Sequence, residues 1–552
     1  MMTFALLVAV IVDFGCDGIG GYPEIEVTGV TAPAKIRVAY ATHPDGLGDK
    51  GDFWHETRAT YLGKSVFLPI LPANTDRYDI FEVLSNGTYR ASLAQGLVRY
   101  AKCTVEHGEA EVRTIRFIND GIHSKEPVVG SFVCSDERLN GVWRASVRTC
   151  QLAAIPGRST PITVGGVHTN ATLGPSLPYL SDGAKRDRLV WSGDLWWAQR
   201  NMYFAFAADS PYMPGSIRML ADSQLPCGYM QAAPFPEAHA PFADGDWGHF
   251  CSDEFAAWFI PVLHDHVLYT GDREMARTML PAVGKLLGYL MRHTNSEWIF
   301  EPRKETCKNA SGLVFGAKSL HHRAYMQVLL WKCFADAAKL ASWAGDAMLE
   351  RTWLTKAERF AEVARRRFWD AQIGGFVSSL ELHEFCPEAN VLAIAAHLVT
   401  EDEAASIIAR HHRHHHGKFQ ALAVRGAFEY GCAKEALRFI ADHNWYAVLS
   451  DDWRGLRTTT ECMGMIRKGW GDEAHPDTAI AGALSNYILG VEPVEPGYAK
   501  FRVRPVCAGS AVTWAKGRVP TPFGFMDVEW HLSDNGKLEI TVSNPRGTER
   551  VE

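Results

Sequence analysis

Residues 181–194 read SDGAKRDRLVWSGD, and they bring three carboxylates, three cations and one tryptophan together within fourteen positions. The two glycines of this segment, and the prolines shortly before it, disfavour a regular helix here. We therefore expect a loop that leads into a helix beginning near Leu195. Loops held by a rigid scaffold are where catalytic groups tend to lie. A solvated charged turn is the alternative, but the apolar residues at 189–191 are interleaved with the charges and disfavour it.

The order of these residues carries a resemblance to a known family. Eight positions match the pattern D-G-x-K/R-R-D/E-R-x-x-W-x-G-D in register, namely Asp182, Gly183, Arg186, Asp187, Arg188, Trp191, Gly193 and Asp194. The chain resembles the inverting α-L-rhamnosidases of glycoside hydrolase family 78, from Asp13 to near Asn544. This resemblance implies a multidomain fold in which a central (α/α)6 toroid is flanked by N-terminal and C-terminal β-sandwich domains. It also implies a rhamnose-containing glycoside or oligosaccharide as the substrate.

The composition is that of a globular protein with more than one domain. A chain of 552 residues exceeds one ordinary domain, and 47% apolar with 22% charged residues does not fit a disordered chain. The net charge of −7 is dispersed over both signs, so no nucleic-acid partner is expected. The 17 tryptophans favour a carbohydrate ligand, because sugars stack their C–H faces on aromatic rings, although core tryptophans would give the same count.

Twelve scattered cysteines without a C-x-x-C pair argue against a structural zinc site. With no nucleotide-binding pattern either, no cofactor is expected. Such cysteines are typical of buried, reduced thiols, which favours a cytoplasmic location. The apolar residues 1–12 leave a secreted or periplasmic protein as the alternative, but they lack the cations of a signal peptide and are too short to span a bilayer. We expect a strand there, no membrane partner, and a domain that could be truncated at its start.

Hydrophobic periodicity divides the chain into three regions. Residues 1–128 alternate with period two or are rich in β-branched residues, which predicts a β-sandwich domain. Residues 129–490 show helical spacing after a helix start at Ser135, and hairpins of helices without intervening strands favour an α/α toroid over a four-helix bundle. A β pattern returns over residues 491–552. The oligomeric state is not predicted.

The clearest individual elements follow from the same periodicities. Helices are expected at 255–269, 275–292, 325–343, 354–368 and 421–442. Strands are expected at 36–40, 88–92, 112–118, 501–505, 526–530 and 538–542.

Cleavage of a glycoside with inversion requires two carboxyl groups on opposite faces of the sugar, roughly 6.5–9.5 Å apart. One protonates the leaving oxygen and the other activates water, so a second acidic site far from the first in sequence is expected. The resemblance assigns the general acid to Asp187. It assigns the general base to Glu461 in the segment RTTTECM, where Thr460 replaces a tryptophan of the family pattern. An acid that begins a helix is the alternative interpretation of Glu461.

The resemblance also implies a set of residues that bind the sugar. Asp182 and Asp194 would accept hydrogen bonds from hydroxyl groups, and Arg186 would donate them. Trp191 and Trp247 would form an apolar wall for the C6 methyl group of a deoxy sugar, with ordinary core packing as the alternative. His475, in the sequence EAHP, would contact the sugar, with a structural histidine in a turn as the alternative.

The histidine-rich segment 411–416 is not expected to be a metal site, because adjacent histidines of a helix cannot all reach one ion. We interpret it as an exposed helix end. Three functions remain open at this stage. The first is an inverting α-L-rhamnosidase. The second is another α/α-barrel glycosidase or a polysaccharide lyase, and the third is a carbohydrate-binding protein that has lost turnover.

Overall fold

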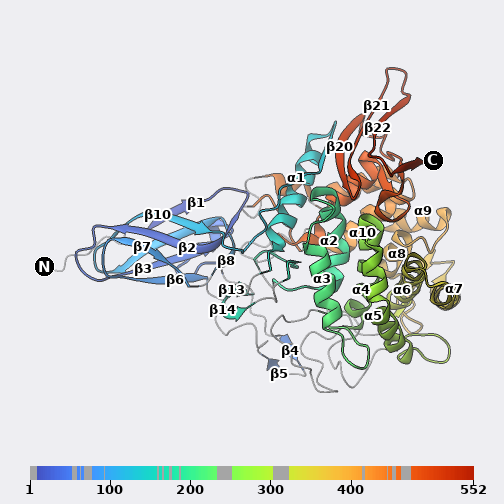
Figure 1. The fold of residues 1–552 in the computed structure, drawn as a ribbon, viewed down its shortest axis with the longest axis horizontal. Coiled ribbons are helices and arrows are strands. Elements are labelled where there is room, and N and C mark those ends of the chain that lie inside the picture. Colours follow the sequence, from blue (N-terminus) through green and yellow to red (C-terminus); the bar gives the residue numbers. More distant parts are fainter. Residues whose placement is uncertain are drawn as a thin grey trace.

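The computed structural model of the chain describes most of its residues. These are 9–52, 59–61, 64–66, 77–92, 94–157, 161–164, 167–172, 177–185, 188–232, 252–301, 323–412, 417–443, 445–450, 456–461 and 474–552. In chain order, a region of strands is followed by a helical region and then by a second region of strands, as the periodicity predicts (Figure 1). The N-terminal strands lie at one end of the molecule, on the left of Figure 1, and the C-terminal strands lie above the helices in this view.

The N-terminal region contains two four-stranded sheets on a common core. Its strands are β1 (Val10–Asp13), β2 (Ile19–Thr28), β3 (Ala34–Ala41), β4 (Ala59–Tyr61), β5 (Lys64–Val66), β6 (Tyr78–Val83), β7 (Gly87–Arg90), β8 (Gln95–Val98), β9 (Tyr100–His107) and β10 (Glu111–Ile118). One sheet has the order β1-β9-β3-β6, and the other has the order β10-β2-β7 with β8 also paired to β2. Inward side chains of both sheets, such as Ile25 of β2 and Ile36 of β3, belong to one hydrophobic cluster.

The helical region accounts for most of the chain. Its α-helices are α1 (Glu137–Ala153), α2 (Ser192–Ala205), α3 (Tyr212–Asp222), α4 (Asp253–Thr270), α5 (Arg273–Arg292), α6 (Arg323–Ala344), α7 (Ala347–Phe368), α8 (Pro387–Ala395), α9 (Glu401–Arg410), α10 (Gly417–Glu429), α11 (Ala433–Asp442) and α12 (Ala481–Ala483), followed by a π-helix (Leu484–Leu489). Short 3-10 helices are Pro44–Gly46, Trp445–Leu449, Pro476–Thr478 and Pro496–Tyr498. Short strands of this region are β12 (Ala154–Ile155), β13 (Pro161–Val164), β14 (Val167–Thr172), β15 (Tyr179–Leu180), β16 (Trp369–Asp370) and β17 (Gly375–Phe376).

Helix boundaries correct the sequence predictions at three places. Asp136, not Ser135, caps α1, because its side chain accepts a hydrogen bond from a backbone N–H of the first turn. Helix α2 begins at Ser192 and not at Leu195. The single helix expected at 421–442 is two helices, α10 and α11, because Gly431 adopts a positive φ of 73° between them.

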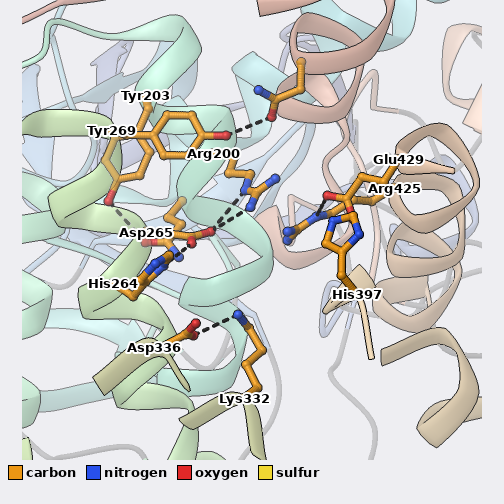
Figure 2. Close-up of polar contacts among 12 residues, drawn as sticks. Arg200, Tyr203, His264, Asp265, Tyr269, Lys332, Asp336, His397, Arg425 and Glu429 are labelled. Atoms are coloured by element: carbon orange, nitrogen blue, oxygen red, sulfur yellow. Dashed lines mark hydrogen bonds and ion pairs between the residues drawn. The ribbon is translucent and has the colours of Figure 1, made fainter. Parts of the chain in front are cut away.

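Buried ion pairs connect the helices in the interior of this region (Figure 2). Arg200 of α2 binds Asp265 of α4 with N–O distances of 3.1 and 3.0 Å. Arg425 of α10 donates to Glu429 of the same helix at 2.8 Å. Burial disfavours the charge of Asp265, but Arg200 holds the pKa of that carboxyl far below its usual value. The Arg200–Asp265 pair holds α2 beside α4, because a charge left alone in this interior would be costly.

The C-terminal sheet includes a strand from the start of the helical region. The strands of the C-terminal region are β18 (Val491–Pro493), β19 (Lys500–Val503), β20 (Trp514–Thr521), β21 (Gly524–Leu532), β22 (Leu538–Ser543) and β23 (Glu549–Val551), and β18, β19 and β23 form a second, separate sheet. Strand β11 (Ser131–Cys134) pairs antiparallel with β20 and extends the sheet to the order β11-β20-β21-β22. Trp530 of β21 is completely buried, and its indole N–H donates to the backbone oxygen of Ile488 in the π-helix at 2.9 Å. The predicted domain boundaries at 128/129 and 490/491 stay predictions.

The nine cysteines within the described residues are free thiols. The predicted cytoplasmic location stays a prediction. None of the helices that the structure describes combines the length and apolar character needed to cross a bilayer. His411 differs from the expected exposed helix end, because it is 4% exposed and its ring pairs with the side chain of Gln420 at 2.9 Å. Residues 413–416 of the histidine-rich segment lie outside the described residues.

The burial of Trp530 predicts that the C-terminal sheet stabilises the helices. Trp530→Ala removes a completely buried indole and its hydrogen bond to Ile488, and we expect a loss of about 3–5 kcal/mol of stability. The matched control is Trp514→Ala on the same sheet, where the side chain is 38% exposed and a loss below about 0.5 kcal/mol is expected. Thermal unfolding of the helical circular-dichroism signal measures both. Equal midpoints for the two variants would contradict this role.

Candidate active site

The first turns of four helices meet at one end of the helical region. Ser192 at the start of α2 donates from its hydroxyl to the backbone oxygen of Phe255 in α4. Lys418 in the first turn of α10 lies with Nζ 4.8 Å from the ring centre of Phe255. Tyr325 in the first turn of α6 donates to Oε1 of Glu254 in α4 at 2.8 Å. Helix N-termini carry partial positive charge, so this convergence favours carboxylates.

Asp194 is the carboxylate that α2 contributes to this convergence. It lies in the first turn of its helix and is half-buried. Nζ of Lys418 lies 4.0 Å from Oδ1 of Asp194, and Lys418 itself is only 2% exposed. The ammonium group of Lys418 also faces the ring of Trp197 at 5.1 Å, an arrangement that stabilises a buried cation. A cation from α10 and the N-terminus of its own helix therefore both lie beside Asp194.

Asp182 closes the loop that carries the charged segment. Its backbone N–H donates to the oxygen of Leu189 at 2.9 Å, and its Oδ1 accepts from the N–H of Leu189 at 2.9 Å. These two bonds bring together the ends of a short loop, and Asp182 is 3% exposed. Oδ1 of Asp182 thus has a structural role, because it holds the backbone of Leu189.

Arg188 fixes the same loop from inside. Its φ of 63° lies in the left-handed region, which is strained for arginine and is tolerated only where surrounding contacts enforce it. Its guanidinium is fully buried and donates to the backbone oxygens of Ala184 and, at 3.1 Å, of Ile122. Burial lowers the pKa of Arg188 to about 10, so it remains a cation at neutral pH. Arg188 therefore ties the loop to the segment between β10 and β11.

Glu461 and His475 lie on segments that are hydrogen-bonded to this loop and to α10. The backbone oxygen of Glu461 accepts from the N–H of Gly417, the residue before Lys418, at 3.3 Å. The N–H of His475 donates to the oxygen of Thr459 at 3.1 Å, and the N–H of Ala184 donates to the oxygen of Ala474 at 3.2 Å. Glu461 is half-buried and His475 is 3% exposed. Segments roughly 270–290 positions apart in sequence are therefore neighbours in space.

Lys185 joins the charged loop to the N-terminal region. Its Nζ lies 2.8 Å from Oδ2 of Asp52, and Arg77 donates to Oδ1 of Asp52 at 2.8 Å. All three side chains are completely buried. Although burial alone raises the pKa of Asp52, Lys185 and Arg77 hold it at about 2, so the carboxylate stays ionised.

The structure places some of the predicted site residues and not others. Those outside the described residues are Arg186, Asp187 and Trp247. Those that it describes are Asp182, Trp191, Asp194, Glu461 and His475. Trp191 is 8% exposed and packs edge-on against Phe255 with ring centres 5.5 Å apart, so much of its surface serves the core. The roles assigned to all eight residues stay predictions.

Four buried residues near the convergence were not identified from the sequence, namely Asp253, Glu254, Tyr325 and Lys418. Asp253 accepts a hydrogen bond from Tyr289 at 2.7 Å. The pair of acids after Ser252 is an ordinary helix-start signal, and it gave no sign that both side chains turn inward. Burial and the neighbouring Glu254 raise the pKa of Tyr325 well above its usual value, so Tyr325 acts as a donor at neutral pH.

Within the described residues, no group of three or more His, Cys, Asp or Glu side chains is arranged to hold a metal ion. A cavity of about 720 Å³ is lined by residues such as Arg218, Thr270 and Phe525. Thr270 ends α4, whereas the helix convergence lies at Asp253, roughly 25 Å away along that helix. This cavity therefore lies away from the helix convergence.

Two family models match the chain, and both describe domains of bacterial α-L-rhamnosidases. A model of the bacterial α-L-rhamnosidase six-hairpin glycosidase domain matches residues 167–421, and a model of the bacterial α-L-rhamnosidase C-terminal domain matches residues 490–551. The two matches together cover more than half of the chain. Glu461 and His475 lie between them. No curated protein matches the chain in a sequence search.

Solved structures share the fold. A family 78 rhamnosidase of Bacillus sp. GL1 matches with a TM-score of 0.74 and 16% identity, over 98% of this chain and 54% of that one. A rhamnosidase from Klebsiella oxytoca with rhamnose bound matches with a TM-score of 0.65 and 16% identity, over 87% of each chain. The α-L-rhamnosidase of Streptomyces avermitilis complexed with L-rhamnose matches with a TM-score of 0.66 and 16% identity, over 98% of this chain and 48% of that one. The chain thus spans about half the length of several structures that it matches.

His123 makes the stability of this site depend on pH. Burial, together with the Arg188 cation, lowers the pKa of His123 to about 3. An unfolded histidine takes up a proton near pH 6.5, whereas the folded one stays neutral. This contribution to stability is therefore complete above about pH 6.5 and falls by about 1.4 kcal/mol per pH unit below it.

We expect His123→Asn to show a smaller loss of stability than the wild type between about pH 7 and about pH 5. Midpoints of urea unfolding at both pH values measure the loss. His531→Asn is the control, because His531 is exposed on β21 and its variant should keep the wild-type dependence. An identical loss of stability between the two pH values in wild type and His123→Asn would show that His123 is not the source of this pH dependence.

Proposed function

Because the chain belongs to the bacterial α-L-rhamnosidases of glycoside hydrolase family 78, we propose that it hydrolyses terminal α-L-rhamnosides with inversion of configuration. Asp187 is the general acid of this proposal and Glu461 is the general base. The structures of similar fold from Klebsiella oxytoca and Streptomyces avermitilis contain rhamnose, which supports a rhamnose-containing glycoside or oligosaccharide as the substrate.

One observation carries this proposal. The loop of Asp182 and the helix start of Asp194 meet the segments of Glu461 and His475, through the bonds Ala184–Ala474 and Gly417–Glu461 and the Lys418–Asp194 contact. An inverting glycosidase needs carboxyl groups from two sides of one sugar, so distant acidic segments must converge. A solvated charged turn would not converge with them, and the near-complete burial of Asp182 also disfavours that alternative.

We further propose that the helices close into an (α/α)6 toroid and that the N-terminal sheets form a β-sandwich. Support comes from the match to a six-hairpin glycosidase model and from the shared core of the two N-terminal sheets. In a closed ring, the last helices return beside the first, which is consistent with the hydrogen bond from Asn201 of α2 to the backbone oxygen of Ala479 at 3.1 Å.

The proposed mechanism assigns separate residues to proton transfer and to sugar binding. Asp187 protonates the leaving oxygen, and Glu461 removes a proton from the water that attacks the anomeric carbon from the opposite face. Asp182 and Asp194 accept hydrogen bonds from sugar hydroxyls, and Arg186 donates to them. His475 contacts the sugar near Glu461, and Trp191 with Trp247 forms the apolar wall for the C6 methyl group.

The stereochemical course tests the proposal. The wild-type enzyme should release the β-anomer of rhamnose first from an aryl α-L-rhamnoside, which proton NMR detects before mutarotation. Glu461→Gln should be inactive on natural and activated substrates alike, because a better leaving group does not activate the water. Azide should restore turnover in this variant and give a rhamnosyl azide of inverted configuration.

The control for Glu461→Gln is Glu358→Gln, which changes an exposed carboxylate on α7 and should keep wild-type activity. Initial release of the α-anomer would contradict inversion. Full activity of Glu461→Gln would remove Glu461 as the base. Binding of rhamnose without hydrolysis of any rhamnoside would instead favour a carbohydrate-binding protein.

Asp187→Asn tests the general acid. An alkoxide leaving group needs a proton, so turnover of natural rhamnosides should fall by about 100-fold or more. An activated aryl leaving group needs little protonation, so turnover of an aryl rhamnoside should fall much less. Steady-state kinetics on both substrates measure the difference. Equal losses would indicate that Asp187 binds the sugar and does not donate the proton.

A further inference from the structure

The cluster of Asp52, Lys185 and Arg77 joins the N-terminal region to the loop of the proposed active site. Oδ2 of Asp52 accepts from Lys185 at 2.8 Å and from the backbone N–H of Thr42 at 2.8 Å, while Oδ1 accepts from Arg77 at 2.8 Å. Arg77 in turn donates to the side chain of Gln95, in β8, at 3.2 Å. The carboxylate is therefore surrounded by donors from the N-terminal region and by one cation from the loop.

Burial of this cluster is costly, which makes a purely stabilising role a poor explanation. Removing charges from water costs several kcal/mol per ion, and buried ion pairs often add no net stability compared with apolar groups of the same size. Their best-supported benefit is to fix one arrangement among several. Here the arrangement that is fixed is the position of Lys185 relative to the N-terminal strands.

The two residues that follow Lys185 in sequence are Arg186 and Asp187. On their other side, Arg188 is held by the backbone oxygens of Ala184 and Ile122. Both flanks of this dipeptide are therefore anchored by completely buried cations. The chain on both sides of Asp187 in the sequence is thus held in place by Lys185 and Arg188.

The N-terminal region also contacts the loop through its backbone. A Cβ atom placed on Gly96 of β8 would lie 2.2 Å from the backbone oxygen of Ala184, so only glycine allows this approach. The N-terminal sheet and the loop are thus in direct contact beside the Asp52–Lys185 pair.

We propose that Asp52, from the N-terminal β region, is a positioning residue of the active site and acts through its ion pair with Lys185 to place the general acid Asp187. The inference rests on the proposed function. It assigns the N-terminal region a part in catalysis, since without Asp52 the Lys185 side chain of the loop loses its ion-pair partner in that region. The expected signature is a loss of proton donation with little loss of sugar binding.

Lys185→Met is the primary test, because it removes the ion pair while Asp52 keeps Arg77 and Thr42 as partners and the fold is retained. On an alkyl α-L-rhamnoside, kcat should fall by about 100-fold with KM within about threefold, because misplacing a catalytic group by about 1 Å has effects of this size. On the dinitrophenyl rhamnoside, which needs little protonation, kcat should fall by less than about fivefold.

Asp52→Asn should give the same dependence on the leaving group. The double variant should be no worse than the more affected single variant, because both substitutions break one interaction. Where Asp52→Asn fails to fold, Lys185→Met decides the question alone.

The matched control is Glu24→Gln in the same region. Glu24 is also a largely buried carboxylate between two cations, Arg90 and Arg116, but its partners lie on the N-terminal strands. The Glu24→Gln variant should be less stable than the wild type, but any change in its kcat should be the same on both substrates. Equal losses on both substrates in Lys185→Met, wild-type kinetics in that variant, or the same kinetic pattern in Glu24→Gln would each overturn the proposal.

Amide hydrogen exchange separates this inference from the proposed function. In Lys185→Met, exchange should become about tenfold faster in residues 182–191 and stay unchanged in the C-terminal sheet. Unchanged exchange in the loop would overturn the positioning role whatever the enzyme hydrolyses. A wild-type protein that cleaves no rhamnoside would overturn the proposed function, and loop exchange would still decide whether Asp52 holds the loop.

Discussion

Buried cations that must find partners determine how distant segments of this chain meet. Lys185 reaches Asp52 of the N-terminal region, Arg188 reaches the backbone oxygen of Ile122, and Arg200 reaches Asp265 of another helix. Each of these cations comes from the charged loop or from the helix that follows it. A cation in a water-free interior is tolerated only with such partners, so the loop can adopt few positions once the regions have packed.

The arrangement of helix starts separates two kinds of carboxylate. Asp194, Asp253 and Glu254 lie in first turns, where the helix dipole favours the ionised form. Such positions suit groups that accept hydrogen bonds from a sugar. A general acid must instead keep its proton, and Asp187 precedes the start of α2 at Ser192 in the sequence. For Asp194, the proposed binding role thus agrees with the dipole of its own helix.

Much of this organisation could be predicted because it depends on local patterns. Period-two and helical spacing predicted the order of strands and helices, and the charged segment with its glycines predicted a loop before α2. The break between α10 and α11 was missed because an apolar pattern continues through Gly431. Asp52, Lys418 and Tyr325 were missed for another reason. Their partners are distant in sequence, and no periodicity records which buried carboxylate or ring a given side chain will reach.

The pairing of β11 with β20 has a consequence for the order in which the protein can be completed. About 380 residues separate Cys134 from its partner Ala515, so a ribosome adding roughly 5–20 residues per second needs about 20–75 seconds between them. Throughout that interval β11 lacks its partner strand, while α1 contacts the backbone of Cys134 through Asn140 and the ring of Phe132 through Trp143. Helices α1 to α12 are all synthesised while β11 still lacks its partner strand β20. Strand β11 can therefore complete its pairing only after β20, near the end of the chain, has been synthesised.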